Sequence, residues 1–267
     1  MGKVVLITGG SSGIGKSIGE FLHHKGFVVY GTSRNPERIS DAIFPLIALD
    51  VRNADSIQSA VAKVIASSGR LDVVINNAGV GITGPLEEIP MEEIKNNFET
   101  NFFGPIEVMK AVLPQMRSQQ SGLIINVTSI AGYMGLPYRS VYSASKGALE
   151  LITEALRMEV KSFGIQITNI APGDFATNIA AGRFHAPVIK GSAYEDSYGN
   201  NLKTMNEHVD AGSNPNEMAE AVYGIIQESN PKIHYKVGAF MQKFSIVLKR
   251  VLPDKVYEKM LMNHYKL

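Results

Sequence analysis

The sequence predicts an α/β protein built on a parallel sheet, and three observations support this fold class. Short runs of Val, Ile and Leu recur along the chain, as in Val4-Val-Leu-Ile7, and such runs are typical of strands buried on both faces. Stretches with helical periodicity separate these runs, so strands and helices alternate. The first run also enters its helical pattern through a glycine-rich turn.

The hydrophobic pattern gives the expected positions of these elements. Strands are expected at residues 3–8, 27–32, 46–50, 71–76, 123–129, 165–170 and 232–237. Helices after the first are expected at about 54–67, 91–118, 142–163 and 215–228. Pro114 should kink the helix at 91–118 or end its regular part, because proline lacks the backbone donor that a helix interior needs.

No linker, low-complexity tract or repeat beyond the strand–helix period divides the chain, so residues 1–267 are expected to form a single domain. Residues from about 173 to 213 are predicted to form a substrate loop, since long loops in compact domains often serve as lids. Residues from about 239 to 267 combine helical apolar spacing with basic residues, which predicts a C-terminal helical extension. Such a helix can make peripheral membrane contact, but packing over the substrate cleft or against a partner subunit is favoured.

Composition excludes several functional classes. The 267 residues carry a net charge of +1, so nothing in the overall charge predicts a nucleic acid partner. The absence of cysteine removes disulfides and cysteine nucleophiles, and the six histidines show no metal-ligand spacing, so no metal site is expected. No apolar run approaches the roughly 18 residues of a transmembrane span. We therefore expect a soluble, cytoplasmic protein.

The glycine-rich turn Gly9-Gly-Ser-Ser-Gly13-Ile-Gly15 predicts a phosphate cradle. Glycines let the backbone approach a pyrophosphate, and the free N–H groups and dipole of the following helix favour its charge. The spacing G-x-x-x-G-x-G differs from the standard dinucleotide fingerprint, G-x-G-x-x-G. A plain tight turn is the alternative, but the strand before it and the helix after it favour the cradle.

The residues after the second strand indicate which dinucleotide would bind. Enzymes that select NAD commonly place an acidic residue here to bond the ribose 2′-hydroxyl. This chain has Ser33 and Arg34 instead, and a guanidinium pairs with a 2′-phosphate that a carboxylate would repel. Although Arg34 could simply be a solvated loop residue, the sequence favours NADP(H).

Polar residues end several of the predicted strands. Because strand carboxyl ends line the ligand crevice of an open α/β sheet, one rim is expected to carry Thr8, Thr32, Asp50, Asn76 and Ser129. Asp50 could bond an adenine amino group or simply begin a turn. The turn after the fourth strand could bound the cofactor or be only an asparagine-rich turn.

Tyr142 and Lys146 form the pair from which an activity can be predicted. Residues four apart share one face of a helix, and a nearby ammonium lowers the pKa of a phenol from its free value of about 10. A tyrosine near neutral pKa can exchange a proton with a substrate oxygen. Among the ten tyrosines, only Tyr142 has a lysine four residues later, although a solvated surface pair would show the same spacing.

Six motifs occur along the chain: Thr8-Gly9-x-x-x-Gly13-x-Gly15, Asn76-Asn77-Ala78-Gly79, Asn101, Ser129, Tyr142-x-x-x-Lys146 and Pro172-Gly173 with Thr177. With these motifs, in the same order and over about residues 3–230, the chain closely resembles the classical short-chain dehydrogenases/reductases. A looser likeness is to the branch with 17β-hydroxysteroid dehydrogenases, retinol dehydrogenases and acyl-dihydroxyacetone-phosphate reductases. The resemblance implies a three-layer doubly wound (Rossmann) fold with a seven-stranded parallel sheet. It also implies a homodimer or homotetramer formed through the helices that start near Met91 and Tyr142.

The resemblance assigns roles to individual residues. Tyr142 would be the general acid/base, Lys146 would lower its pKa and hold the nicotinamide ribose, and Ser129 would polarise the carbonyl. Asn101 would position a relay water, and Thr177 would contact the carboxamide end of the cofactor. The expected cofactor-binding residues are Thr8, Gly9, Ser11, Ser12, Gly13, Ile14, Gly15, Ser33, Arg34, Asp50, Val51, Asn77, Ala78, Gly79, Tyr142, Lys146, Pro172, Gly173 and Thr177.

The expected activity is therefore an NADP(H)-dependent interconversion of a small-molecule carbonyl and a secondary alcohol. Apolar residues after Ser129 favour a lipid-, steroid- or retinoid-like substrate, although any lid over a nicotinamide must exclude water. A non-catalytic NADP(H)-binding sensor or scaffold on the same fold is the alternative. A hydrolase reading of Ser143-Ala-Ser-Lys146 fails because its companion motifs are missing.

Overall fold

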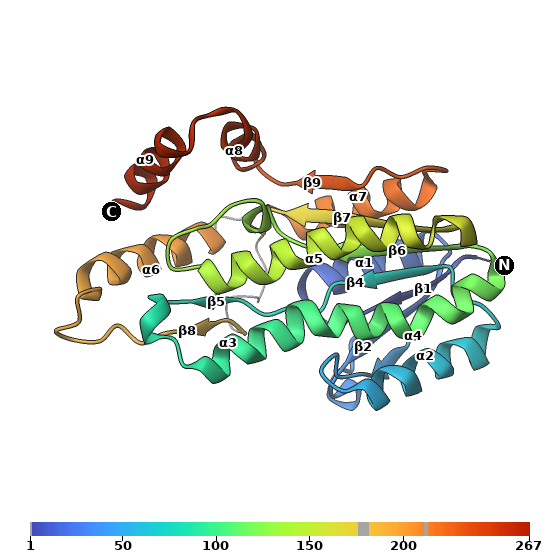
Figure 1. Ribbon diagram of the computed structural model, residues 1–267. Coiled ribbons are helices and arrows are strands. Elements are labelled where there is room, and N and C mark those ends of the chain that lie inside the picture. The colour runs from blue at the N-terminus through green and yellow to red at the C-terminus, as the bar shows by residue number, and fades with distance from the viewer. Residues whose placement is uncertain (1, 176–181, 211–212) are drawn as a thin grey trace.

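The computed structural model describes residues 2–175, 182–210 and 213–267 (Figure 1). Its strands are β1 (Val4–Ile7), β2 (Val28–Ser33), β3 (Leu46–Ala48), β4 (Val73–Asn76), β5 (Ile82–Thr83), β6 (Gly122–Val127), β7 (Ile165–Pro172), β8 (Phe184–His185) and β9 (His234–Val237). Seven of them form one parallel sheet in the order β3-β2-β1-β4-β6-β7-β9. The predicted doubly wound α/β fold is confirmed.

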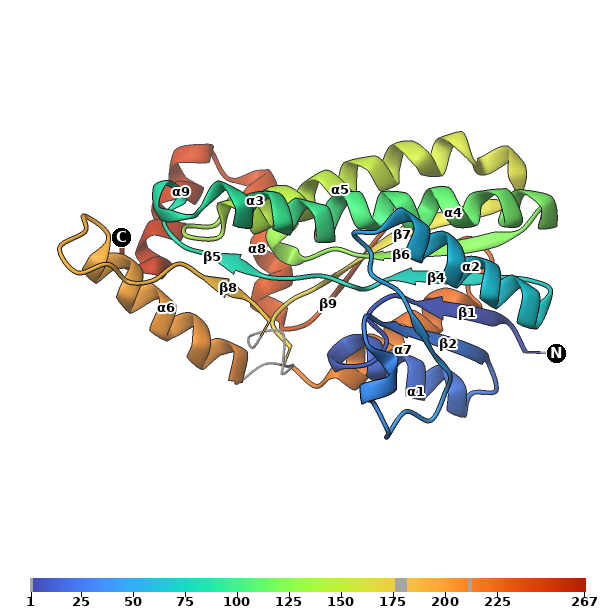
Figure 2. The same ribbon diagram turned by 90° about the horizontal axis from the view of Figure 1, so that it is seen from below.

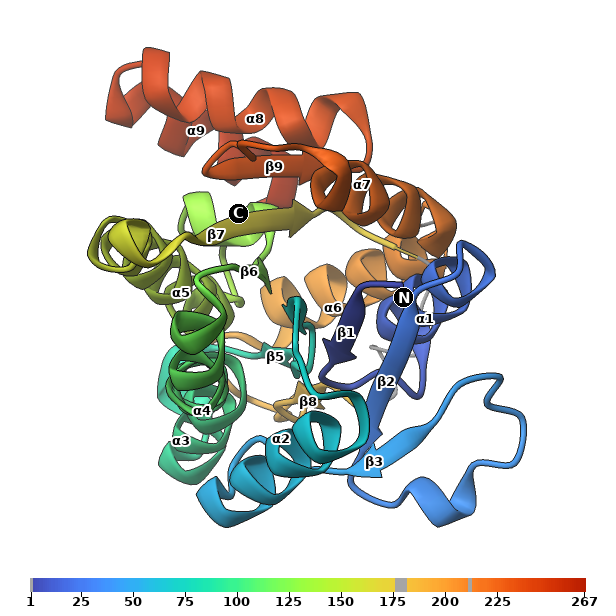
Figure 3. The same cartoon turned by 90° about the vertical axis from the view of Figure 1, so that its right-hand side faces the viewer.

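Helices cover both faces of this sheet. They are α1 (Gly13–His24), α2 (Ala54–Ser68), α3 (Met91–Phe98), α4 (Gly104–Gln119), α5 (Ser140–Glu159), α6 (Glu195–Asp210), α7 (Pro215–Gln227), α8 (Phe240–Val251) and α9 (Asp254–Tyr265). Figure 3 shows α2, α4 and α5 on one side of the sheet and α1 and α7 on the other.

Two apolar cores lie on the two faces because successive strand residues point in opposite directions. Leu6 and Val74 belong to the core under α2, α4 and α5, while their neighbours Val5 and Val73 belong to the core under α1 and α7. Each of these side chains is at most 1% exposed. The continuous apolar runs of the sequence are therefore explained by a sheet that is covered on both faces.

The strand order reverses between β1 and β4, and this position sets where a ligand can bind. The chain first builds outward from β1 to β3, and then outward in the other direction from β4 to β9. Helices that diverge at such a switch point leave a crevice at the carboxyl ends of the two strands. In Figure 2 the same end of the sheet carries β5, β8, α6 and α9.

The predicted long helix at 91–118 is divided, but not where its proline suggested. A π-helical segment, Glu99–Phe103, separates α3 from α4, and α4 continues past Pro114 to Gln119. A π-helical turn carries an extra residue, so it rotates the following side chains and is often found at functional sites. Here it holds Asn101, which is 0% exposed.

The prediction of a loop over the whole of residues 173–213 was wrong in part. The described part of this segment contains the short strand β8, which pairs with β5, and the sixteen-residue helix α6. Tyr198, Leu202 and Met205 give α6 an apolar stripe at spacings of three or four. Gly199 and the asparagines that follow it hid this pattern, since these residues are poor helix formers.

The C-terminal extension consists of two helices, α8 and α9, with Pro253 between them. Ile246 from α8 and Tyr257 from α9 pack against Ile130, Met134 and Ala171 of the sheet region. The extension is therefore attached through an apolar cluster of its own. Within the part of the chain that the structure describes, no helix combines the length and apolarity needed to cross a bilayer.

We predict that Ile246→Ala lowers the free energy of unfolding by about 2–5 kcal/mol, the range for truncating a buried aliphatic side chain. Ile246 is 1% exposed, whereas its neighbour Val247 is 49% exposed. Val247→Ala is the matched control and should change stability by less than about 0.5 kcal/mol. Urea titrations of both variants measure the difference, and equal losses would show that α8 is not anchored through Ile246.

Candidate active site

The glycine turn after β1 has the geometry of an anion cradle. Gly9 and Gly13 have φ values of 63° and 51°, which glycine adopts without strain. A Cβ on Gly15 would lie 2.3 Å from the carbonyl oxygen of Gly9, so the turn and the helix approach too closely for a side chain. Ser12 makes no side-chain cap at the start of α1, and the first turn contains no acidic residue. The helix N-terminus therefore keeps N–H groups for an incoming anion.

Asn77, in the turn after β4, holds the cradle to the sheet. Its amide nitrogen Nδ2 donates to the carbonyl oxygens of Thr8 and Gly9, at 3.0 and 3.2 Å. The Thr8 hydroxyl accepts the backbone N–H groups of Asn77 and Ala78, both at 3.0 Å. The asparagine-rich turn is thus a structural clamp between β1 and β4, in addition to forming a cavity wall.

Arg34 and Asp50 lie at the far end of the same rim, after β2 and β3. Asp50 accepts the backbone N–H of Arg52 at 2.9 Å, and the Arg52 guanidinium lies 3.4 Å from its carboxylate. Partial burial would raise the pKa of Asp50, but these bonds and the charges of Arg52 and Arg34 outweigh it and hold the pKa below its usual range. The guanidinium groups of Arg34 and Arg52 therefore both lie at this end of the rim.

Lys146 is buried at the carboxyl end of β6. It is 4% exposed, and its Nζ donates to the carbonyl oxygen of Val127 at 3.0 Å. A Cβ on Gly79 would lie 3.3 Å from this Nζ and 3.2 Å from Asn101 Oδ1, so the three residues meet closely. Burial lowers the pKa of Lys146 to about 8, and the charge of Glu150 acts in the opposite direction.

Asn101 and Ser129 both make hydrogen bonds to backbone groups of the loops near Lys146. Asn101 bonds both backbone groups of Val80, at 2.9 Å each, and so fixes the chain after Gly79. The Ser129 hydroxyl oxygen accepts the N–H of Ala131 at 3.2 Å. Its O–H can therefore donate to a substrate oxygen.

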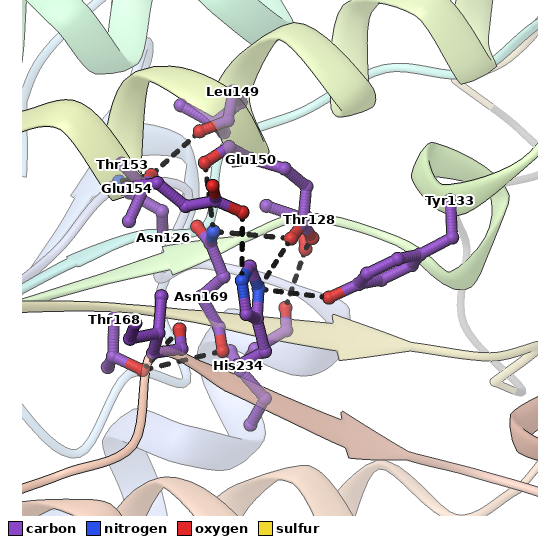
Figure 4. Close-up of polar contacts among 12 residues, drawn as sticks. Asn126, Thr128, Tyr133, Leu149, Glu150, Thr153, Glu154, Thr168, Asn169 and His234 are labelled. Atoms are coloured by element: carbon purple, nitrogen blue, oxygen red, sulfur yellow. Dashed lines mark hydrogen bonds and ion pairs between the residues drawn. The ribbon is translucent and has the colours of Figure 1, made fainter. Parts of the chain in front are cut away.

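Behind Lys146 lies a polar network centred on the buried carboxylate of Glu150, shown in Figure 4. The Thr128 hydroxyl donates to one carboxylate oxygen of Glu150, and Asn169 donates to the other at 3.2 Å. His234 bridges Glu150 and Glu154, at 2.8 and 3.0 Å. The hydrogen bond to Glu150 raises the pKa of His234 despite its partial burial, with further support from Glu154.

Two cavities meet at this site. One of about 530 Å³ extends from the glycine turn to Tyr142 and Lys146, and one of about 880 Å³ begins at Ser129. Pro172 lines both. The larger cavity is walled by α6, α8 and α9, so the C-terminal extension packs over it.

The structure brings most of the predicted site residues together. The smaller cavity is lined by Gly9, Ser11, Ser12, Gly13, Ile14, Ser33, Arg34, Asp50, Val51, Asn77, Ala78, Gly79, Tyr142, Lys146 and Pro172. Thr8 and Gly15 support its wall, and Gly173 lines the larger cavity instead. Thr177 lies outside the described residues.

Four residues of the site region were not predicted. Arg52, Arg139 and Arg183 line the cavities, and His234 joins the network behind Lys146. Arg139 precedes Tyr142 by three residues, so helical spacing would have indicated it. Arg183 and His234 come from distant parts of the chain, and no local signal points to them.

Comparisons with known proteins agree with this geometry. The sequence model of the family described as short chain dehydrogenase matches residues 3–187. A 3-ketodihydrosphingosine reductase of Bacteroides thetaiotaomicron is 40% identical and covers 98% of each chain. A short-chain dehydrogenase of Streptomyces avermitilis superposes with a TM-score of 0.86 at 30% identity, covering 100% of this chain and 97% of that one. A short-chain dehydrogenase of Burkholderia cenocepacia, solved with NADP, gives a TM-score of 0.76 at 25% identity, covering 99% and 97%.

We predict that the stability contributed by His234 depends on pH. Because the folded-state pKa is raised above the ordinary 6.5, the contribution is fully present below pH 6.5 and is lost as the pH rises through the folded value. The difference in unfolding free energy between the wild type and His234→Gln should therefore shrink with rising pH. Denaturant titrations across this range measure it, and a difference that stays constant or grows would contradict the assignment.

Proposed function

The chain belongs to the short-chain dehydrogenase/reductase family of oxidoreductases, and we propose that it interconverts a carbonyl and a secondary alcohol using NADP(H). The observation that carries this proposal is the meeting of two cavities at one set of side chains. Tyr142 and Lys146 lie at the end of the cavity that begins at the glycine cradle. Ser129 lies at the start of the larger cavity, where a substrate can enter.

The residues of the site have complementary tasks in this reaction. Bound NADP(H) supplies the hydride in reduction and accepts it in oxidation. The Tyr142 hydroxyl gives its proton to the carbonyl oxygen in reduction, and its oxygen takes the proton back in oxidation. Ser129 donates a hydrogen bond to the same oxygen, where negative charge develops. The Lys146 ammonium has three donors and uses one on Val127, so the others would serve to hold a ribose hydroxyl of the cofactor.

The cofactor proposal rests on the charge at the rim of the smaller cavity. Structures with this fold have been solved with NADP and with NAD, so the choice depends on individual residues. Ser33, Arg34 and Arg52 line the end of the cavity where the adenosine ribose would lie. Guanidinium groups favour a phosphate at this place, which supports NADP(H).

An apolar substrate is supported by the lining of the larger cavity. Its apolar side chains are Ile130, Ala131, Met134, Leu136, Met205, Met241, Leu248, Met260 and Leu261. A volume of about 880 Å³ is large enough for a long chain or a ring system. The relative named 3-ketodihydrosphingosine reductase acts, by that name, on a long-chain amino ketone, and the long chain agrees with a lipid-like substrate here.

Two exposed apolar surfaces support further parts of the proposal, a homo-oligomer and a contact with a membrane surface. Phe103, Leu151 and Met158 are exposed on the π-helical segment and α5, which supports a homodimer or homotetramer formed there. On α8, the exposed Phe240 and Phe244 stack with their ring centroids 5.7 Å apart, and Arg250 is exposed on the same helix, a combination suited to peripheral membrane contact.

We predict that Tyr142→Phe lowers turnover by roughly 10²- to 10⁴-fold while NADPH binding is retained, because only the proton donor is lost. Initial rates and a fluorescence titration with NADPH measure the two quantities. Tyr30→Phe, which removes a hydroxyl bonded to Ser68, is the control and should keep full activity. NADPH binding by a wild type that turns over no carbonyl substrate would favour a non-catalytic sensor instead.

We predict that Arg34→Ala weakens NADPH binding about ten- to hundredfold and changes NADH binding little. A hydrogen bond to a charged group contributes about 1.5–3 kcal/mol, and NADH lacks the 2′-phosphate. Isothermal calorimetry with both cofactors measures the ratio. Arg38→Ala is the control, since Arg38 is exposed nearby but does not line the cavity. An equal loss for NADPH and NADH would remove Arg34 from 2′-phosphate recognition.

A further inference from the structure

The larger cavity is apolar along most of its wall, but two guanidinium groups lie at its catalytic end. Arg139 and Arg183 both line it, and both are close to Tyr142. The carbon Cζ of Arg139 lies 5.6 Å from the centroid of the Tyr142 ring. Neither residue takes part in the proton transfer proposed above.

The two-stranded sheet fixes the position of Arg183. Ile82 of β5 pairs with Phe184 of β8, and the N–H of Phe184 donates to the carbonyl oxygen of Gly81 at 3.1 Å. A Cβ on Gly81 would lie 2.8 Å from both Cγ and Nε of Arg183, so the arginine side chain packs on bare glycine backbone. The position of the Arg183 side chain is therefore fixed by its packing on Gly81, a residue that lines the smaller cavity, while Arg183 itself lines the larger one.

Arg183 has unused hydrogen-bonding capacity. Its Nη1 is buried and has no hydrogen-bond partner among the described residues. Burial lowers the pKa of Arg183, and the positive charge of Arg139 lowers it further, while the negative charge of Asp174 acts in the opposite direction without bonding to the buried Nη1. An unpaired, partly desolvated guanidinium beside a second one is unfavourable unless an anion joins them.

The other charged residues that line the larger cavity also favour an anion. Lys203 and Lys266 also line the cavity, and Asp174 is the single carboxylate among its described lining residues. The Asp174 carboxylate already accepts a hydrogen bond from Gln242 at 2.7 Å. The cavity is therefore positive at its polar positions and would attract an anion more than an ammonium group.

We infer that Arg139 and Arg183 form an anion-binding site beside Tyr142, and that the substrate is an amphipathic ketone or alcohol with a carboxylate or phosphate near the reacting carbon. This inference rests on the proposed function, because it assigns the substrate class of the same site. The apolar chain of the substrate lies along Met134, Leu248 and Leu261, and its anion lies between the guanidinium groups. Arginine suits either anion, since its planar fork binds two oxygens at once.

The test compares substrates that share a chain and differ in charge. With NADPH, kcat/KM is measured for a long-chain oxo-acid and its methyl ester, for a long-chain keto phosphate monoester and the corresponding keto alcohol, and for an amino ketone of equal length. We expect the anion of each pair to be preferred about ten- to hundredfold, mainly through KM. The amino ketone, which is the chemistry implied by the name of the Bacteroides thetaiotaomicron relative, is expected to be disfavoured, and a preference for it over the anions would overturn the inference. The two pairs distinguish a carboxylate from a phosphate.

Variants connect the preference to the two arginines. Arg183→Gln and Arg139→Gln should bring the ratio of anion to neutral partner towards one, and Arg183→Lys should keep part of it. Lys190→Gln, an exposed cation of the same segment outside the cavity lining, should keep the full ratio. A loss of NADPH affinity in Arg183→Gln would overturn the inference, because the arginine would then serve the cofactor.

The outcomes separate this inference from the proposed function. Equal turnover of charged and neutral partners, abolished for both by Tyr142→Phe, would overturn the anion site and leave the oxidoreductase standing. If no compound is turned over, the anion site is tested by calorimetry, which compares the affinities of the oxo-acid and its ester for the NADPH-loaded protein. Tighter binding of the acid then supports the anion site, and equal binding overturns it.

Discussion

The burial of one ammonium group, on Lys146, constrains much of this structure. Removing a charge from water is unfavourable unless other groups replace the solvent, and here they do so from several elements. Val127 supplies a carbonyl oxygen from β6, and Glu150 supplies a negative charge one helical turn away. Glu150 is itself buried and is held by Thr128, directly after β6, and by Asn169 of β7. The contacts that stabilise this one cation thus tie β6, β7 and α5 together.

A parallel sheet is well suited to this task because it brings the ends of distant segments to one edge. The glycine cradle, the asparagine clamp and Ser129 all follow strands of the same sheet. None of them lies near another in the sequence. Rigid strands fix their mutual positions, and the loops between them remain free to carry the polar groups.

Much of this arrangement was predictable from the sequence, because it is encoded in local patterns. The continuous apolar runs predicted the strands, and the motifs around Gly9, Asn77 and Tyr142 predicted residues that the structure brings to one cavity. The π-helical segment around Asn101 was not predicted, since its cause is tertiary: Asn101 bonds to Val80, twenty-one residues earlier. Arg183 and His234 were also not predicted. The pairing of β5 with β8 fixes the position of Arg183, and the ion pair with Glu150 fixes that of His234.

The walls of the two cavities come from different parts of the chain. The cavity that begins at the glycine cradle is built mostly from the first half of the sequence, whereas α6, α8 and α9 close the larger one. Mutations in the last third of the chain can therefore alter the larger cavity while the glycine cradle, Tyr142 and Lys146 stay intact. Such a division lets selectivity diverge during evolution, or be exchanged by grafting tails between homologues, without rebuilding the reaction centre.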